Sequence, residues 1–114
     1  MSRIDSDTLY GTLKVLILKT LSAEPLHGLA IARSIGETSD EYLKVEEGAL
    51  YPALHRLERA GFLRSTWGAS ENNRRAKFYA LTQQGRRHLD REIRSWARHA
   101  GAVAKVLDVR PSTG

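Results

Sequence analysis

The chain has 114 residues, no cysteine and a formal net charge of +5 at pH 7. This length suits one domain with an added helix, and the missing thiols exclude disulfides, thiol catalysis and cysteine-ligated metal sites. No apolar run approaches the roughly 18 residues that a membrane helix needs, and the opening MSRIDSDTLY lacks the pattern of a secretory signal. We therefore expect a cytoplasmic protein without a membrane partner, and the positive charge favours a polyanionic partner.

The first forty-six residues are expected to form two helices and a connector. Residues 1–6 look like a loose start. A helix at about 8–22 carries apolar residues around nearly its whole circumference, so it needs cover on more than one side. Pro25 ends that helix, a short helix follows at about 26–36, and 36–46 is a polar connector.

A third helix is expected within 45–63, VEEGALYPALHRLERAGFL. Its leucines recur at helical spacing and form a buried side, whereas the opposite side carries glycine, aromatic and basic groups. Gly61 suits a left-handed cap that ends the helix. Pro52 predicts either a bend after the first turn or a helix that begins near Ala49. Such an outer face fits the major groove of DNA, and the alternative is an ordinary amphipathic surface helix.

Two strands are expected after this helix, at 62–67 and 75–81, around the polar loop 68–73. The segment from 64 to 77 holds four cations, Arg64, Arg74, Arg75 and Lys77, against one carboxylate, Glu71. Three helices followed by a hairpin is the order of a winged helix-turn-helix domain. The cations at the loop exit would then contact phosphates or enter the minor groove, and the alternative is a flexible solvated loop.

A long final helix is expected from about 83 to 107, with Thr82 as its cap. Its apolar residues are spaced 4-3-4-3-4, which is a heptad pattern, and they are Leu89, Ile93, Trp96, Ala100, Val103 and Leu107. So narrow a stripe on a projecting helix favours a two-fold dimer in which this helix and the first helix are covered by the partner. The alternative is pairing of the first and last helices within one chain.

The predicted architecture is therefore mainly α with a small β-hairpin. Residues 1–81 form a winged helix-turn-helix domain, 82–107 form a C-terminal dimerisation helix, and 108–114 form a disordered tail. The four histidines show no metalloprotease or triad spacing, and no glycine-rich phosphate loop occurs. We expect no catalytic residue, no metal site and no cofactor, so the chain is not predicted to be an enzyme.

The sequence resembles the PadR family of bacterial winged-helix transcriptional regulators, in the short form with one C-terminal helix. The resemblance rests on EEGALYPALHRLERAGFL at 46–63, STWGASENNRRAKFYALTQQG at 65–85 and LYGTLKVLILKTLSAEPLHGLAI at 9–31. It implies a homodimer that binds an inverted-repeat operator in double-stranded DNA, usually as a repressor. Some relatives release DNA when a small aromatic effector binds near the dimer interface.

Carried onto this chain, the resemblance and the residue pattern nominate three sets of residues. The DNA-binding set is His27, Gly28, Glu46, Glu47, Gly48, Ala49, Tyr51, Pro52, His55, Arg74, Arg75 and Lys77. The dimerisation set is Leu9, Leu13, Leu16, Leu89, Ile93, Trp96, Ala100, Val103 and Leu107. Trp96 is also the candidate for binding an aromatic ligand, with a plain core tryptophan as the alternative. A second reading of the whole chain is a protein-interaction module that acts through its C-terminal helix.

Overall fold

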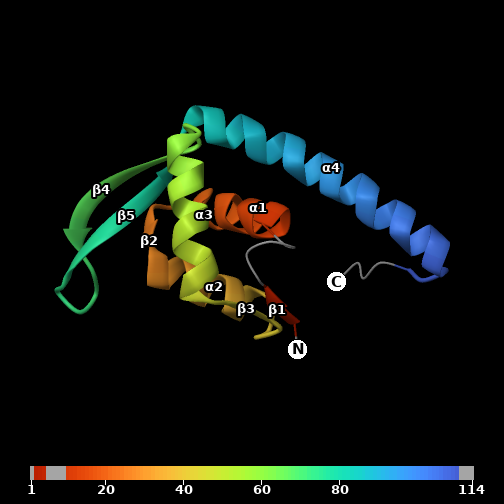
Figure 1. Ribbon diagram of the computed structural model, residues 1–114, viewed down its shortest axis with the longest axis horizontal. Helices are drawn as coiled ribbons and strands as arrows, with labels where there is room; N and C mark the ends of the chain where they lie inside the picture. The colour runs from red at the N-terminus through yellow and green to blue at the C-terminus, as the bar shows by residue number, and fades with distance from the viewer. Residues whose placement is uncertain (1, 5–9, 111–114) are drawn as a thin grey trace.

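The computed structural model describes residues 2–4 and 10–110, and Figure 1 shows their arrangement. The elements in chain order are β1 (Ser2–Ile4), α1 (Tyr10–Leu21), β2 (Leu26–His27), α2 (Gly28–Thr38), β3 (Leu43–Val45), α3 (Glu47–Arg59), β4 (Leu63–Ala69), β5 (Arg75–Leu81) and α4 (Gln83–Leu107). The expected class, mainly helical with a hairpin and a long last helix, is confirmed. Within the described part of the chain, no helix combines the length and apolar character needed to cross a membrane.

The core lies between α1, α2 and α3 and under the sheet. Leu50, Leu54 and Leu57 of α3 are fully buried, which confirms the leucine side that their spacing predicted. They pack with apolar residues of α1 and α2 and with Tyr79 of β5 in one cluster. Burying this set is the main source of the fold's stability, and it fixes α3 relative to the other two helices.

The three-stranded sheet has the order β2-β5-β4. Strand β2 was not expected, because its two residues were assigned to the start of the second helix. They are extended instead, and Leu26 and His27 pair antiparallel with Tyr79 and Phe78 of β5. The pairing joins residues about fifty positions apart, and no local pattern in so short a segment indicates it.

A second, two-stranded sheet was also unexpected. Strand β1 pairs in parallel with β3, with Arg3 opposite Lys44. The prediction of a loose start is therefore wrong at 2–4, and the connector expected at 36–46 contains a strand at 43–45. Both segments leave unpaired backbone groups when taken alone, and pairing them satisfies those groups. Their parallel alignment places the chain start beside the segment that leads into α3.

Helix α3 runs through Pro52 without interruption, so it does not begin at Ala49. Its cap residue, Glu46, is extended and makes no side-chain cap hydrogen bond. The helix ends at a left-handed Gly61, with φ of +87°, as predicted. The N–H of Phe62 donates to the Leu57 carbonyl across this turn at 3.0 Å.

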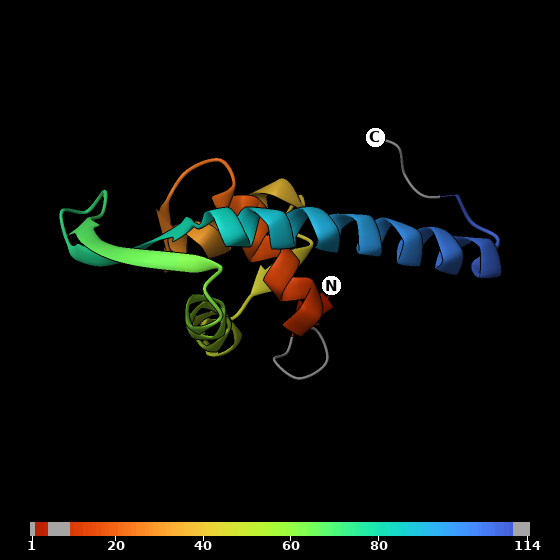
Figure 2. The same cartoon turned by 90° about the horizontal axis from the view of Figure 1, so that it is seen from above.

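Helix α4 begins at the predicted cap. The Thr82 hydroxyl accepts from the Gly85 N–H at 3.0 Å and donates to the Gly61 carbonyl at 2.7 Å, so one side chain joins two helix ends. From there α4 extends well beyond the rest of the domain, on the side away from the hairpin (Figures 1 and 2). It ends at Asp108, in the left-handed conformation, and the Val109 N–H closes the last turn on Ala104. Residues 111–114 of the expected tail lie outside the described residues.

Candidate nucleic-acid interface

The outer surface of α3 carries most of the groups that its sequence placed there. Gly48, Pro52 and His55 are exposed, and Tyr51 is half-buried. Ala49 is different, because its side chain is buried in the core cluster together with the leucines. The expectation that Ala49 faces DNA is therefore corrected: its side chain points away from this surface. The exposed residues form a convex helix face that protrudes from the domain, seen end-on in Figure 2.

Tyr51 connects this face to the start of α2. A Cβ on Gly28 would lie 2.7 Å from the Tyr51 hydroxyl oxygen, so the ring packs directly on the glycine. Burial raises the pKa of the Tyr51 phenol, and the nearby Glu47 carboxylate adds to this effect. The ring stays neutral near pH 7 and keeps its O–H as a donor. Gly28 therefore serves close helix packing, and it sets where the Tyr51 hydroxyl lies.

The hairpin of β4 and β5, which we call the wing (residues 63–81), pairs in full register from Leu63–Leu81 to Ala69–Arg75. At its outer end the Arg75 guanidinium lies over the ring of Trp67, 4.8 Å from the ring centroid. This contact holds one predicted DNA-binding cation in place on an exposed aromatic surface. Arg74 is exposed in the adjoining turn.

Lys77 is placed differently from the other wing cations. Its ammonium lies 3.5 Å from the Glu58 carboxylate of α3, which also accepts from the Ser65 hydroxyl at 2.6 Å. The Ser65 hydrogen bond, assisted by Lys77, holds the pKa of Glu58 below its ordinary value. Lys77 therefore joins the wing to α3 and has part of its charge compensated within the protein.

His27 lies at the junction of β2 and α2, and only 7% of it is exposed. Its Nδ1 accepts from the Ala30 N–H at 3.3 Å and so caps α2. Its Nε2 lies 3.1 Å from a carboxylate oxygen of Glu71, on the wing turn. The resemblance places His27 among the DNA-binding residues, whereas in the structure its Nε2 is paired with the carboxylate of Glu71 of the protein itself.

The predicted dimerisation residues differ in how deeply they are buried. Leu13 and Leu89 are buried in the chain's own core, because α1 and the first turns of α4 pack on each other. Their side chains are not available to a partner, which corrects that part of the prediction. Leu16 and Ala100 are partly buried, while the outer stripe of α4 is exposed and comprises Ile93, Trp96, Val103 and Leu107. Leu9 lies outside the described residues.

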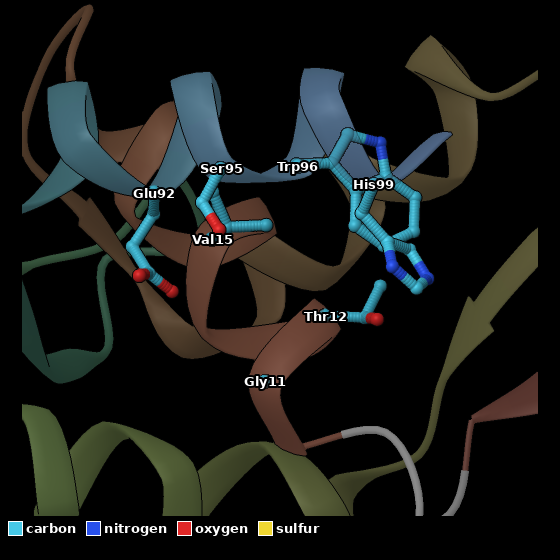
Figure 3. A pocket seen from close by; sticks show the side chains of 7 residues that line it. All are labelled: Gly11, Thr12, Val15, Glu92, Ser95, Trp96 and His99. Atoms are coloured by element: carbon cyan, nitrogen blue, oxygen red, sulfur yellow. The ribbon is translucent and has the colours of Figure 1, made fainter. Parts of the chain in front are cut away.

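A cavity of about 300 Å³ opens between α1 and α4. Figure 3 shows Trp96 and His99 of α4 side by side over Thr12 of α1, with Gly11 below and Val15 beside Ser95. The two rings have centroids 5.9 Å apart at an angle of 40°. On the first turns of α4, Glu92 also pairs with Lys14 at 3.2 Å. Trp96, the residue predicted to bind a ligand, therefore lines this cavity, and 51% of the Trp96 surface remains exposed.

Several contributors to this surface escaped the sequence reasoning. They are Arg33, Glu58, Ser65, Trp67 and Glu71. Trp67 had a usable signal, since it stands directly opposite Lys77 once the hairpin register is drawn. The others act through contacts between distant segments. No group of three metal-ligating side chains gathers among residues 2–4 and 10–110.

Three helices share a buried core, the third helix has one exposed face, and a basic β-hairpin lies beside it. This arrangement defines a winged helix-turn-helix protein, the architecture of DNA-binding transcriptional regulators. Comparison with known proteins gives the family. The model of the transcriptional regulator PadR-like family matches residues 17–91, more than half of the chain. The chain therefore belongs to the PadR family, and it is a transcriptional regulator rather than an enzyme.

Solved structures of relatives share this fold over nearly their full length. A transcriptional regulator from Clostridium thermocellum is 28% identical, with a TM-score of 0.78 over 88% of this chain and 97% of that one. A PadR-like regulator from Bacillus cereus is 27% identical, with a TM-score of 0.75 over 92% and 100%. A PadR family regulator from Eggerthella lenta is 33% identical, with a TM-score of 0.72 over 88% and 85%.

Proposed function

We propose that the protein acts as a homodimeric repressor that binds an inverted-repeat operator. The observation that carries the proposal is the exposed apolar stripe of α4, on a helix that extends past its own domain (Figure 1). Leu107, near the end of that stripe, is 64% exposed. A second copy offers the same stripe in return, and two-fold pairing would present two α3 helices to successive major grooves.

In the proposed complex, α3 enters the major groove with His55, Tyr51 and the exposed residues of its N-terminal half, which are Glu46 at the cap, Glu47, Gly48 and Pro52. The wing follows the flanking backbone or minor groove through Arg74 and Arg75, while Lys77 fixes the wing to α3. Gly28 and His27 lie at the start of α2, where the helix dipole favours a phosphate, while the Ala30 N–H and the His27 Nε2 already have partners within the protein. In this arrangement the wing residues contact the DNA backbone and fix the orientation of the protein, and the exposed face of α3 makes the base contacts.

Dimerisation can be tested with two matched valines of α4. Val103 belongs to the apolar stripe, whereas Val106 is exposed outside it. Val103→Glu is expected to shift the protein from dimer to monomer in light scattering and to weaken DNA binding by at least tenfold. Val106→Glu introduces the same charge into the same helix and is expected to leave the dimer intact. Equal behaviour of the two variants would contradict the proposal.

Operator binding is tested by selecting bound duplexes from a random pool. We expect an inverted repeat with half-sites roughly 34–36 Å apart, one turn of DNA. Asymmetric selected sequences would contradict the paired use of α3. Repression is then tested by placing the selected sequence in a promoter that drives a reporter, with and without the protein. A rise in reporter output would identify an activator and overturn the repressor assignment.

We also propose that a planar aromatic molecule binding at the Trp96 cavity weakens the DNA complex. The cavity lies between α1 and the apolar stripe of α4, so a bound ring would alter how two copies meet there. Quenching of Trp96 fluorescence in a Trp67→Phe background tests binding of a planar aromatic compound that does not itself bind DNA. Quenching without any change in DNA affinity would separate ligand binding from release and contradict the proposed control.

A further inference from the structure

The tip of the wing is a closed turn with little freedom to move Glu71. The Ser70 N–H donates to the Arg74 carbonyl and the Asn73 N–H donates to the Ser70 carbonyl, both at 2.8 Å. Asn73 adopts the left-handed conformation, with φ of +57°, which completes the turn. The position of the Glu71 backbone therefore follows from the register of the hairpin.

From this turn the Glu71 carboxylate reaches back to α2. One oxygen lies 3.1 Å from Nε2 of His27, and the other lies 3.4 Å from Nη1 of Arg33. These residues are 44 and 38 positions away in the sequence. A hydrogen bond from its own backbone N–H, together with that from His27, holds the pKa of Glu71 below its ordinary value. The carboxylate is thus ionised near neutral pH.

The His27 end of this contact is rigid. Because Nδ1 accepts from the Ala30 N–H, the ring proton resides on Nε2 and is donated to Glu71. The backbone of His27 pairs with Phe78, and its ring meets the Phe78 ring edge-on with centroids 5.4 Å apart. Arg33 is exposed and adds a weaker pair. His27 is therefore a fixed anchor, and the turn that carries Arg74 is attached to it.

We propose that Glu71 is a positioning residue for DNA binding, which holds the wing turn on α2 so that Arg74 and Arg75 meet the DNA backbone in a fixed arrangement. The inference rests on the proposed function of the wing. A carboxylate on a basic DNA-binding surface would ordinarily repel phosphate, and its removal alone would tighten binding. A positioning role has the opposite consequence, because a loosened turn must be ordered again when DNA binds.

The test compares wild type with Glu71→Gln and Glu71→Ala in two measurements. In the free protein, amide hydrogen exchange of residues 70–74 should be faster in Glu71→Ala and less affected in Glu71→Gln, whose amide oxygen can still accept from His27, while the exchange of α3 stays unchanged. Binding to a mixed-sequence DNA duplex at low salt should weaken about three- to tenfold, although a negative charge has been removed. Glu37→Gln removes a carboxylate from the far end of α2 and serves as the control, with neither change expected.

A double-mutant cycle separates the contact from a general charge effect. His27→Asn retains a good cap for Ala30 but is too short to reach Glu71. In a His27→Asn, Arg33→Gln background, Glu71→Ala should have no further effect on exchange and should no longer weaken DNA binding, so that only the tightening from the lost negative charge remains. Tighter DNA binding by Glu71→Ala, which removes the contact entirely, or unchanged exchange at 70–74 in that variant, overturns the proposal. Failure of the wild type to bind any duplex would contradict the proposed function, while the exchange measurement would still decide whether the contact holds the turn.

Discussion

The imidazole of His88 is stacked on the ring of Phe62, with centroids 4.2 Å apart and planes inclined by 10°. Phe62 follows the glycine that ends α3, and His88 lies in the second turn of α4. The stack therefore joins the end of the proposed recognition helix to the start of the proposed dimerisation helix. Burial, with a further contribution from Lys14, lowers the pKa of His88 from its ordinary 6.5, and its buried Nε2 has no hydrogen-bond partner among the described residues.

His88→Phe is expected to raise the free energy of unfolding by about 1 kcal/mol, because it keeps the stack and removes an unpaired buried nitrogen. The gain should grow on acidification. A lowered folded pKa means that the unfolded chain binds more protons below about pH 6.5, so the wild type loses stability as the pH falls through that value. Urea unfolding of the wild type and the variant at about pH 7.5 and 5.5 measures the gain in unfolding free energy and its dependence on pH. A gain that is equal at the two pH values would contradict the titration of His88.

Gly28→Ala should displace Tyr51 with little loss of stability. The added methyl would lie 2.7 Å from the Tyr51 hydroxyl oxygen, at the far end of a side chain that can rotate away. We expect a change of less than about 1 kcal/mol in unfolding free energy and a five- to twentyfold loss of affinity for the selected operator. In a Tyr51→Ala background the same substitution should cost nothing further in affinity. A full additional loss there would place the effect of Gly28 elsewhere, for example in its own contact with phosphate.

The two kinds of wing cation should respond differently to salt. Arg74→Gln removes an exposed charge, and the logarithmic salt slope of DNA binding should fall by about 0.9 if it contacts one phosphate. Lys77→Gln should lower the slope by less, since Glu58 already compensates part of that charge. It should also lower the melting temperature slightly, because Glu58 loses its ion-pair partner and keeps only the hydrogen bond from Ser65. The measurement is fluorescence anisotropy at four salt concentrations, and equal slopes for both variants would refute the distinction.

The parts of this fold that the sequence predicted are those specified by local pattern. The period of Leu50, Leu54 and Leu57 identified the buried side of α3, and the Thr82 cap gave the exact start of α4. Ala49 was misplaced, although its spacing of four from Ala53 marks a second buried row beside the leucines. The turn chemistry of Gly61 was also readable, since only a left-handed residue suits that position.

The parts that could not be predicted depend on register and on the approach of distant segments. The contact between Glu71 and His27 requires both the hairpin register and the pairing of β2 with β5. The ion pair of Lys77 with Glu58 likewise depends on the angle between the wing and α3. Counting charges predicted correctly that the wing is positively charged. It could not distinguish Arg74, which is exposed, from Lys77, which pairs with Glu58 and stabilises the protein itself.

Gly85 gives the sharpest prediction about stability, because the space that a side chain would need there is filled chiefly by the main chain of Phe62. A Cβ there would overlap the carbonyl oxygen of Phe62 and press on Leu81. Neither the carbonyl nor the first turn of α4 can rotate away, since Thr82 ties this turn to Gly61. Gly85→Ala should therefore destabilise the protein by about 2–4 kcal/mol, although alanine favours a helix by about 1 kcal/mol.

The matched control is Gly101→Ala in the same helix, where the added methyl would meet open space. Gly101→Ala is expected to leave the free energy of unfolding unchanged or to raise it, as measured by urea unfolding. Gly85→Ala should lower this free energy without changing its dependence on urea concentration. Ser at position 85 should be at least as harmful as Ala, because the clash is set by Cβ. If Gly85→Ala proved neutral, α4 would be able to shift relative to the α3–β4 turn, and the fixed geometry between the two proposed working helices would be refuted.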